Sequence, residues 1–193
     1  MYPPLATALW IIAPIALAGL TQVAVIKLGG LKSLAARPLD FGATLQGRRL
    51  FGDNKTWRGV VVMVGATAVW AAACEWLAAV CHWPVGGAVP FEAVHPFSWG
   101  ALAGLGYVAG ELPNSFIKRR LEIAPGAAAR AGAARWAFWT IDQVDSLAGV
   151  LIFLYPVWQP SLAVVLCLFG VTMLVHPAVA LIMLGLGLKA RVG

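Results

Sequence analysis

The sequence has 193 residues, of which 61% are hydrophobic and only 11% are charged, and its mean hydropathy is +0.82. Soluble domains carry about 25% charged residues, so this composition excludes an ordinary soluble protein and indicates an integral membrane protein. The three cysteines, Cys74, Cys81 and Cys167, form no CxxC pair. A disulfide framework or a zinc site is therefore not expected.

Five long apolar runs follow one another along the chain and predict five transmembrane helices. They cover residues 5–26, 60–81, 98–117, 136–154 and 161–187. The first run has no cation before it and exceeds the roughly 7–15 residues of a signal-peptide h-region, so we expect it to remain in the protein with its N-terminus outside. The predicted fold class is an all-α integral membrane bundle, with residues 1–193 forming a single transmembrane domain.

The positions of the basic residues predict which way the bundle faces. Seven of the fourteen Lys and Arg residues lie in residues 27–58, five lie in residues 118–135, and Lys189 and Arg191 are near the C-terminus. With five spans, all three groups fall on one side, as the excess of cations in cytoplasmic loops requires. The sequence thus predicts a multi-pass protein of the cytoplasmic membrane, with long cytoplasmic loops after the first and third spans and a cytoplasmic C-terminus.

A polar stretch, FGDNKTWRG at residues 51–59, separates the first two apolar runs. Its polar side chains are Asp53, Asn54, Lys55, Thr56 and Arg58. Hydrocarbon cannot hydrogen-bond an irregular backbone, so the stretch must lie at the membrane surface or in a protein-lined cavity. Its glycines, carboxylate, amide, hydroxyl and cations suit a phosphate-rich ligand with its metal. It is not a P-loop, because the first Gly of GxxxxGK[ST] and a preceding strand are absent.

Two pairs of oxygen-bearing side chains lie at helical spacing in the third and fourth spans. Asp142 and Asp145 are three residues apart, as are Glu111 and Asn114, so each pair lies on one helical face. Two such helices could converge on one hard divalent cation. The alternative is that each carboxylate pairs with a nearby arginine. Two acids close together without a metal would repel each other, so we favour the metal site.

Glycines recur in the third span at the spacing of close helix packing. The pairs are Gly100-x-x-x-Gly104 and Gly106-x-x-x-Gly110. Small residues at this spacing let neighbouring helices approach closely. The second pair could instead leave room for a ligand beside the backbone, and the same spacing permits a homodimer. We expect close packing.

Three blocks, in this order, resemble the CDP-archaeol synthase family, which is related to the bacterial phosphatidate cytidylyltransferases. They are GDNKTWRG at residues 52–59, SFIKRR at 115–120 and DQVD at 142–145, with further matches in PLD at 38–40 and GRRLF at 47–51. The resemblance runs from about residue 27 to 150. One position departs from the family pattern: the usual Asp after Gly in the third span is Glu111. Pro113, which follows closely, would bend the helix or mark its unwound end.

The resemblance implies a membrane enzyme that transfers CMP from CTP to a lipid phosphate, releasing pyrophosphate, with Mg²⁺ as cofactor. The lipid would be an ether-lipid glycerol phosphate or a phosphatidate-like molecule, and no nucleic acid is expected as a partner. The implied metal ligands are Glu111, Asp142 and Asp145. The implied catalytic residues are Asp142, Asp145 and Lys118. The implied substrate-binding residues are Asp53, Asn54, Lys55, Thr56, Arg58, Ser115, Arg119 and Arg120.

A second hypothesis remains, in which the protein is a transporter or a non-catalytic lipid- or nucleotide-binding protein that uses the same charges. A transporter would place these charges near the membrane midplane in broken helices. In this sequence they lie at the inner ends of the spans, which favours chemistry on a soluble nucleotide at a site facing the cytoplasm.

Overall fold

The computed structural model describes residues 3–83, 94–125 and 132–187, together with residues 89, 91 and 127. In chain order the elements are α1 (Pro4–Lys27), α2 (Lys32–Ala35), β1 (Thr44–Leu45), β2 (Arg48–Arg49), α3 (Trp57–Val80), α4 (Pro96–Arg120), α5 (Ala133–Leu154) and α6 (Leu162–Gly185). Each apolar run expected from the sequence lies on one of the long helices. The terminal cations Lys189 and Arg191 lie outside the described residues.

Length and hydropathy mark four of the described helices as candidate membrane spans: α1, α3, residues 135–154 of α5, and α6. α4 has 25 residues but is not among them. Glycines recur along it and charged residues gather near its C-terminal end, and both lower its hydropathy. On α6, Leu162, Leu166 and Leu174 are 73%, 62% and 73% exposed. Large apolar side chains exposed along an apolar helix are typical of a surface that faces hydrocarbon.

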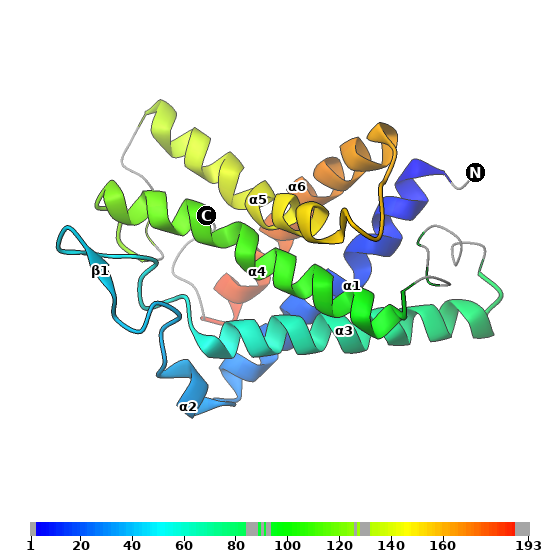
Figure 1. Ribbon diagram of the computed structural model, residues 1–193, viewed down its shortest axis with the longest axis horizontal. Coiled ribbons are helices and arrows are strands. Elements are labelled where there is room, and N and C mark those ends of the chain that lie inside the picture. Colours follow the sequence, from blue (N-terminus) through cyan, green and yellow to red (C-terminus); the bar gives the residue numbers. More distant parts are fainter. Residues whose placement is uncertain are drawn as a thin grey trace.

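α4 lies between α3 and α5, while α1 packs against α3 and α6 (Figure 1). Glycines on two faces of α4 explain how closely its neighbours approach. A Cβ added at Gly104 would lie 2.7 Å from the Val64 Cα atom of α3, and one added at Gly106 would lie 2.8 Å from the Val150 Cα atom of α5. Real Cβ atoms do not approach that closely, so only glycine fits. The close packing expected from the sequence is confirmed, and both glycine faces are used within the chain.

The helix carrying Pro113 continues to Arg120. Pro113 therefore does not end α4, although it removes one backbone donor from the helical ladder. The charged residues after it, Lys118, Arg119 and Arg120, remain on a regular helix.

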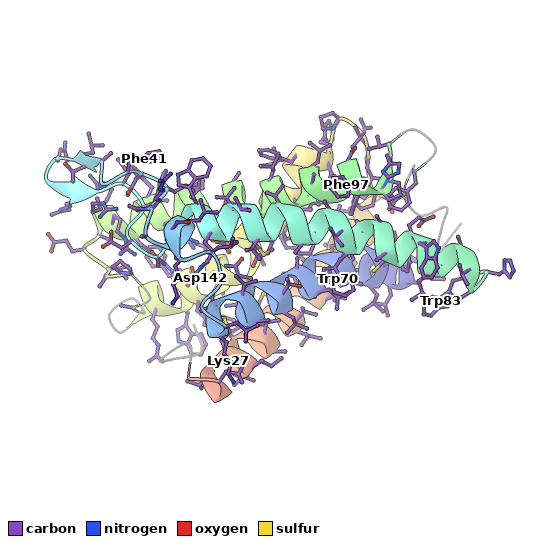
Figure 2. All side chains as sticks on the ribbon, turned by 90° about the horizontal axis from the view of Figure 1, so that it is seen from below. Lys27, Phe41, Trp70, Trp83, Phe97 and Asp142 are labelled. Carbon is purple, nitrogen blue, oxygen red and sulfur yellow. The ribbon has the colours of Figure 1, made fainter. Side chains whose placement is uncertain are left out.

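Polar residues gather at one end of the molecule. Figure 2 shows Lys27, Phe41 and Asp142 toward this end and Trp83 at the opposite end. We define the polar end as the segment from 28 to 56, the C-terminal part of α4 and the N-terminal half of α5. The opposite end is aromatic, with the Trp99 ring centroid 5.9 Å from that of Phe91 and 6.4 Å from that of Trp158.

The segment between α1 and α3 folds around one buried carboxylate, that of Asp40. Asp40 accepts hydrogen bonds from the backbone N–H groups of Gly42, Phe51 and Gly52, and its carboxylate forms an ion pair with Arg49 at 2.6 Å. Burial alone would raise the pKa of Asp40, but these donors stabilise its ionised form and hold the pKa well below its usual range. This carboxylate fixes the loop that leads into α3.

The antiparallel strands β1 and β2 form a hairpin that lies on the C-terminal end of α4 (Figure 1). The guanidinium group of Arg120 donates to the carbonyl oxygens of Leu45, Arg48 and Arg49 at 2.5, 2.8 and 2.6 Å. In return, Arg48 donates to the Arg120 carbonyl and pairs with Glu122 at 2.5 Å. The two polar segments that follow α1 and α4 are thus joined.

Candidate active site

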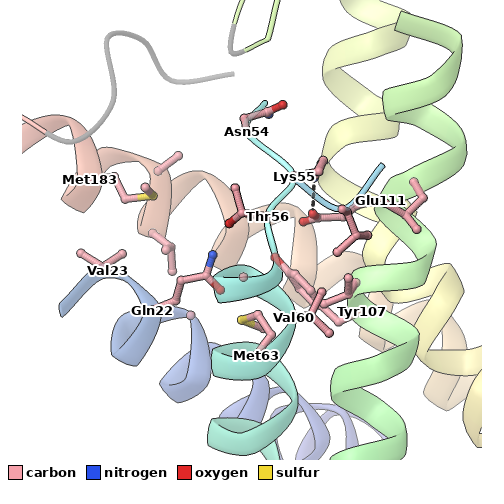
Figure 3. Close-up of a pocket in the computed structure, with 17 residues that line it drawn as sticks. Gln22, Val23, Asn54, Lys55, Thr56, Val60, Met63, Tyr107, Glu111 and Met183 are labelled. Carbon is pink, nitrogen blue, oxygen red and sulfur yellow. Dashed lines mark hydrogen bonds and ion pairs between the residues drawn. The ribbon is translucent and has the colours of Figure 1, made fainter. Parts of the chain in front are cut away.

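A partly buried ion pair connects the lead into α3 with α4. The Lys55 ammonium group pairs with the Glu111 carboxylate, and the two side chains are only 20% and 26% exposed (Figure 3). Burial alone would lower the pKa of Lys55, but the charge and the hydrogen bond of Glu111 outweigh that effect and raise it. Lys55 therefore stays protonated, and its charge stands inside the polar end.

Asn114 brings the two aspartates of α5 together. Its Nδ2 group donates to Oδ1 of Asp142 at 2.6 Å and to Oδ2 of Asp145 at 2.8 Å. The i, i+3 spacing of these aspartates puts both on the face that meets α4. The contact is close because Gly110 lies directly against the Asp145 backbone carbonyl. Lys118, one helical turn beyond Asn114, donates to Oδ2 of Asp142 at 2.6 Å.

Two further polar groups adjoin these residues. Glu111 lies near enough to Asp145 for their charges to interact. The Tyr107 side chain lies close to those of Glu111 and Ser146. Three predicted site carboxylates, those of Glu111, Asp142 and Asp145, therefore share one region between α4 and α5, and Lys55 and Lys118 supply opposite charge to it.

The chemistry of these groups fits a hard divalent cation, although the carboxylates are engaged by lysines. Among the described residues, no group of three or more His, Cys, Asp and Glu side chains could hold a metal ion as it stands. However, Oδ1 of Asn114 is buried and has no hydrogen-bond partner in the part of the chain that the structure describes. A buried acceptor without a donor is costly, by about 1–3 kcal/mol. An oxygen left open beside two carboxylates is a suitable ligand for Mg²⁺.

A buried cation lies next to the polar stretch. Arg119 is only 9% exposed, and its Nε and Nη1 atoms have no hydrogen-bond partner among the described residues. A Cβ at Gly52 would lie 3.5 Å from Nη1 of Arg119 and 3.4 Å from Oδ1 of Asn54. Gly52 also has a φ of +98°, which side-chain-bearing residues rarely adopt. A Cβ there would also lie 3.1 Å from Cγ of Pro125, so glycine lets the loop backbone approach the buried guanidinium closely.

Other predicted site residues lie apart from this group. The Asp53 side chain is 78% exposed and forms an ion pair with Arg49 at 2.5 Å. Arg58 lies on the first turn of α3 and makes no ion pair with a described residue. The Ser115 side chain is buried within α4. Arg120 has its guanidinium group on the hairpin carbonyls, so its observed contacts are those of a residue that joins two segments.

A cavity of about 210 Å³ opens beside the Lys55–Glu111 pair, between α1, α3, α4 and α6 (Figure 3). We call it the polar cavity. Asn54, Thr56 and Gln22 line it together with this pair. The sequence analysis predicted roles for Asn54 and Thr56 but missed Gln22 and Tyr107. Gln22 could have been recognised as an amide side chain inside an apolar run. Tyr107 could have been recognised as a hydroxyl group one helical turn before Glu111.

A second, smaller cavity of about 60 Å³ lies deeper in the bundle, and we call it the apolar cavity. Its lining includes Ile12 and Ile15 of α1, Val150 of α5 and Val175 of α6. Gly19, Tyr107 and Val179 line both cavities. The two spaces are therefore neighbours, one polar and one apolar, on the side of α4 that faces α1 and α6.

Comparison with known proteins places the chain among membrane enzymes of lipid synthesis. The family model described as CarS-like, CDP-archaeol synthase, matches residues 1–192. The CDP-archaeol synthase of Pyrococcus furiosus is 36% identical over 174 residues, covering 90% of this chain and 89% of its own length. That of Methanopyrus kandleri is 35% identical over 171 residues, covering 87% of this chain and 82% of its own length.

A solved structure, described as an intramembrane enzyme for archaeal membrane lipids biosynthesis, matches with a TM-score of 0.60 at 28% identity. The match covers 90% of this chain and 92% of that one, so the likeness extends over the helices as well as the polar end. The enzyme hypothesis is thereby favoured over the transporter. The chain belongs to the CDP-archaeol synthase family, and it is a membrane enzyme of the CTP-dependent cytidylyltransferase class, which makes a CDP-lipid.

Proposed function

We propose that this enzyme transfers CMP from CTP to the phosphate of an archaeol-type ether lipid, giving CDP-archaeol and pyrophosphate. The names of the relatives from Pyrococcus furiosus and Methanopyrus kandleri support this choice of lipid. A lipid phosphate oxygen forms a bond to the α-phosphorus of CTP, while the bond from that phosphorus to the bridging oxygen breaks and pyrophosphate leaves. In such reactions the protein mainly positions the phosphates and neutralises their charge.

The observation that carries the proposal is the arrangement of charges around Asn114. Asp142 and Asp145 both accept hydrogen bonds from the Asn114 amide, and Glu111 lies beside them. The Oδ1 atom of Asn114 has no donor among the described residues. These four side chains would hold Mg²⁺. When bound, the ion would neutralise phosphate charge and polarise the reacting phosphate group.

The lysines now paired with these carboxylates would turn to the substrates. Lys55 and Lys118 lie at opposite sides of the carboxylate group, one before α3 and one on α4. Arg119, buried and without partners at its Nε and Nη1 atoms, would bind the triphosphate beside Gly52. The remaining proposed substrate contacts are those of Asp53, Asn54, Thr56, Arg58, Ser115 and Arg120.

We also propose that α4 is a fifth span and that the polar end faces the cytoplasm, with the N-terminus outside. α4 packs along two helices that are themselves candidate spans, α3 and α5, and its length of 25 residues is sufficient to cross a bilayer. Its glycine faces are covered by these neighbours. The basic residues of 27–58 and 118–120 lie at the polar end, as expected for cytoplasmic segments of a protein in the cell membrane.

The test is turnover by the purified protein in mixed micelles with CTP and Mg²⁺. An ether-linked glycerol phosphate, a diacyl phosphatidate and a lipid alcohol without phosphate would be compared, with dCTP and ATP as nucleotide controls. We expect pyrophosphate and a CDP-lipid in equal amounts, fastest with the ether lipid and CTP. Folded protein that releases no pyrophosphate with any lipid phosphate would contradict the proposal, and a preference for the diacyl lipid would contradict the choice of lipid.

A further inference from the structure

The polar and apolar cavities follow one another along α1. Gln22 lines the polar cavity, Gly19 lines both, and Ile15 and Ile12 line the apolar cavity. At about 1.5 Å rise per residue, Gln22 and Ile12 are separated by roughly 15 Å along the helix. The chain thus presents a continuous change from polar to apolar surroundings over that length, starting beside the Lys55–Glu111 pair.

Gly19 lies where the two spaces adjoin, since it lines both. Apart from the backbone of its own helix and its chain neighbours, no atom lies within 4 Å of the position that a Cβ at Gly19 would take. This glycine therefore differs from those of α4, whose missing Cβ atoms are replaced by backbone of the next helix. At Gly19 the missing side chain leaves open space.

Gln22 is the polar side chain that α1 contributes to this path. Its Oε1 atom is buried and has no hydrogen-bond partner among the described residues. Figure 3 shows its amide group extending into the polar cavity toward Thr56. The Nε2 group of this amide is a donor, so a phosphate oxygen in the polar cavity can accept a hydrogen bond from it. A water-soluble ligand would not use the apolar continuation below it, whereas a molecule with a polar head and a hydrocarbon chain would use both.

We propose that the two cavities together bind the lipid phosphate. Its phosphate and glycerol occupy the polar cavity near Lys55, Thr56 and Gln22, and the first part of one hydrocarbon chain passes Gly19 into the apolar cavity. This assignment rests on the proposed function, and it adds the place of the lipid and a positioning role for Gln22. Glu111, which lines the polar cavity and lies near Asp145, puts the lipid phosphate next to the carboxylate group.

The first test places a bulky side chain at Gly19. Gly19→Leu would place a side chain where the hydrocarbon chain passes, and Gly170→Leu is the matched control, because Gly170 on α6 also has nothing within 4 Å of its Cβ position and lines neither cavity. With overpacking costs of about 1–3 kcal/mol, we expect the KM of a long-chain glycerol phosphate to rise roughly 5- to 100-fold in Gly19→Leu. The KM of CTP should not change, and a short-chain analogue should be affected much less.

A second variant keeps the test informative if Gly19→Leu is poorly folded. Gln22→Met preserves length and removes the amide, so we expect the KM of long- and short-chain lipid phosphates to rise equally, by roughly tenfold, because a hydrogen bond to a charged group is lost. An unchanged lipid KM in both variants would overturn the proposal. So would an equal rise for both chain lengths in Gly19→Leu, or the same rise in Gly170→Leu.

Binding without turnover separates this inference from the proposed function. Thermal unfolding of the purified protein would be followed with the long-chain lipid phosphate present and CTP absent. A ligand that binds the folded state raises the unfolding temperature. If the protein shows no cytidylyltransferase activity but is stabilised by the lipid, and Gly19→Leu abolishes that stabilisation, the cavity assignment stands alone. Absence of stabilisation in the unchanged protein would overturn it.

Discussion

The faces of α4 are built differently. On two faces, α3 and α5 lie against its glycines with backbone in contact with backbone. Toward α1 and α6, both described cavities open. Close packing holds the carboxylates of α4 and α5 at fixed positions, whereas looser packing leaves space for a ligand. In the proposed mechanism, the closely packed side holds the carboxylates and the open side admits the lipid.

The largest effect should come from disrupting the close packing between α4 and α5. Gly149→Leu would drive a side chain into the Gly106 carbonyl and the Gly110 backbone, which cannot move away independently of α4. We expect loss of folded, active protein, measured as recovery of monodisperse protein from detergent and as residual turnover. The control is Gly65→Leu, where nothing lies within 4 Å of the added Cβ. Folded Gly149→Leu protein with normal turnover would show that the α4–α5 contact is not required.

The next effect should come from removing one carboxylate of the site. Asp142→Asn keeps the size of the side chain but loses its charge and its ion pair with Lys118. We expect kcat to fall roughly 100-fold or more, because a preorganised electrostatic contact to the transition state is lost. Glu122→Gln, at a side chain that is 73% exposed and pairs with Arg48, is the matched control. Equal rates in the two variants would remove Asp142 from the proposed site.

A smaller effect is expected at the buried arginine. Arg119→Met retains the apolar part of the side chain but removes the unpartnered guanidinium beside Gly52. We expect the KM of CTP to rise roughly tenfold and the KM of the lipid phosphate to stay unchanged, since charged hydrogen bonds contribute about 1.5–3 kcal/mol. Lys32→Met, at an exposed cation of α2, serves as the control. A lipid KM that rises while the CTP KM does not would assign Arg119 to the other substrate.

The smallest effect concerns the loop before α3. Asp40→Asn would weaken the contacts to Arg49 and to three backbone N–H groups, so residues 41–50 should be cleaved roughly 5- to 10-fold faster by a protease at pH 7. The low pKa of Asp40 means that its contribution is present above the ordinary carboxyl pKa and is lost as the pH falls through the depressed value. The difference between the two proteins should therefore be constant from pH 5 to 8. A difference that disappears near pH 6 would contradict the assigned ionisation state.

The helices could be predicted because apolar runs and helical spacing are local properties. The pairing of Glu111 with Asn114 and of Asp142 with Asp145 followed from the same spacing, and Asn114 indeed bridges the two aspartates. α4 shows the limit of hydropathy: its glycines lower its hydropathy, and they are present because neighbouring backbones occupy the place of side chains.

Contacts between distant segments could not be predicted. The attachment of the hairpin to Arg120 and the Lys55–Glu111 pair depend on tertiary structure that joins residues more than fifty positions apart. The role of Asp40 was missed because a single carboxylate in a loop resembles any solvated one. It became visible only when three backbone donors were seen to converge on it.

The attachment of the hairpin has a consequence for how the chain is made. Strands of two residues each are too short to be stable in isolation. The donors that hold their carbonyl oxygens belong to Arg120, which leaves the ribosome some seventy residues later. Synthesis proceeds from the N-terminus, so the hairpin cannot adopt its final structure until α4 has been made. Completion of the polar end is thereby a late event, because it depends on the synthesis of Arg120.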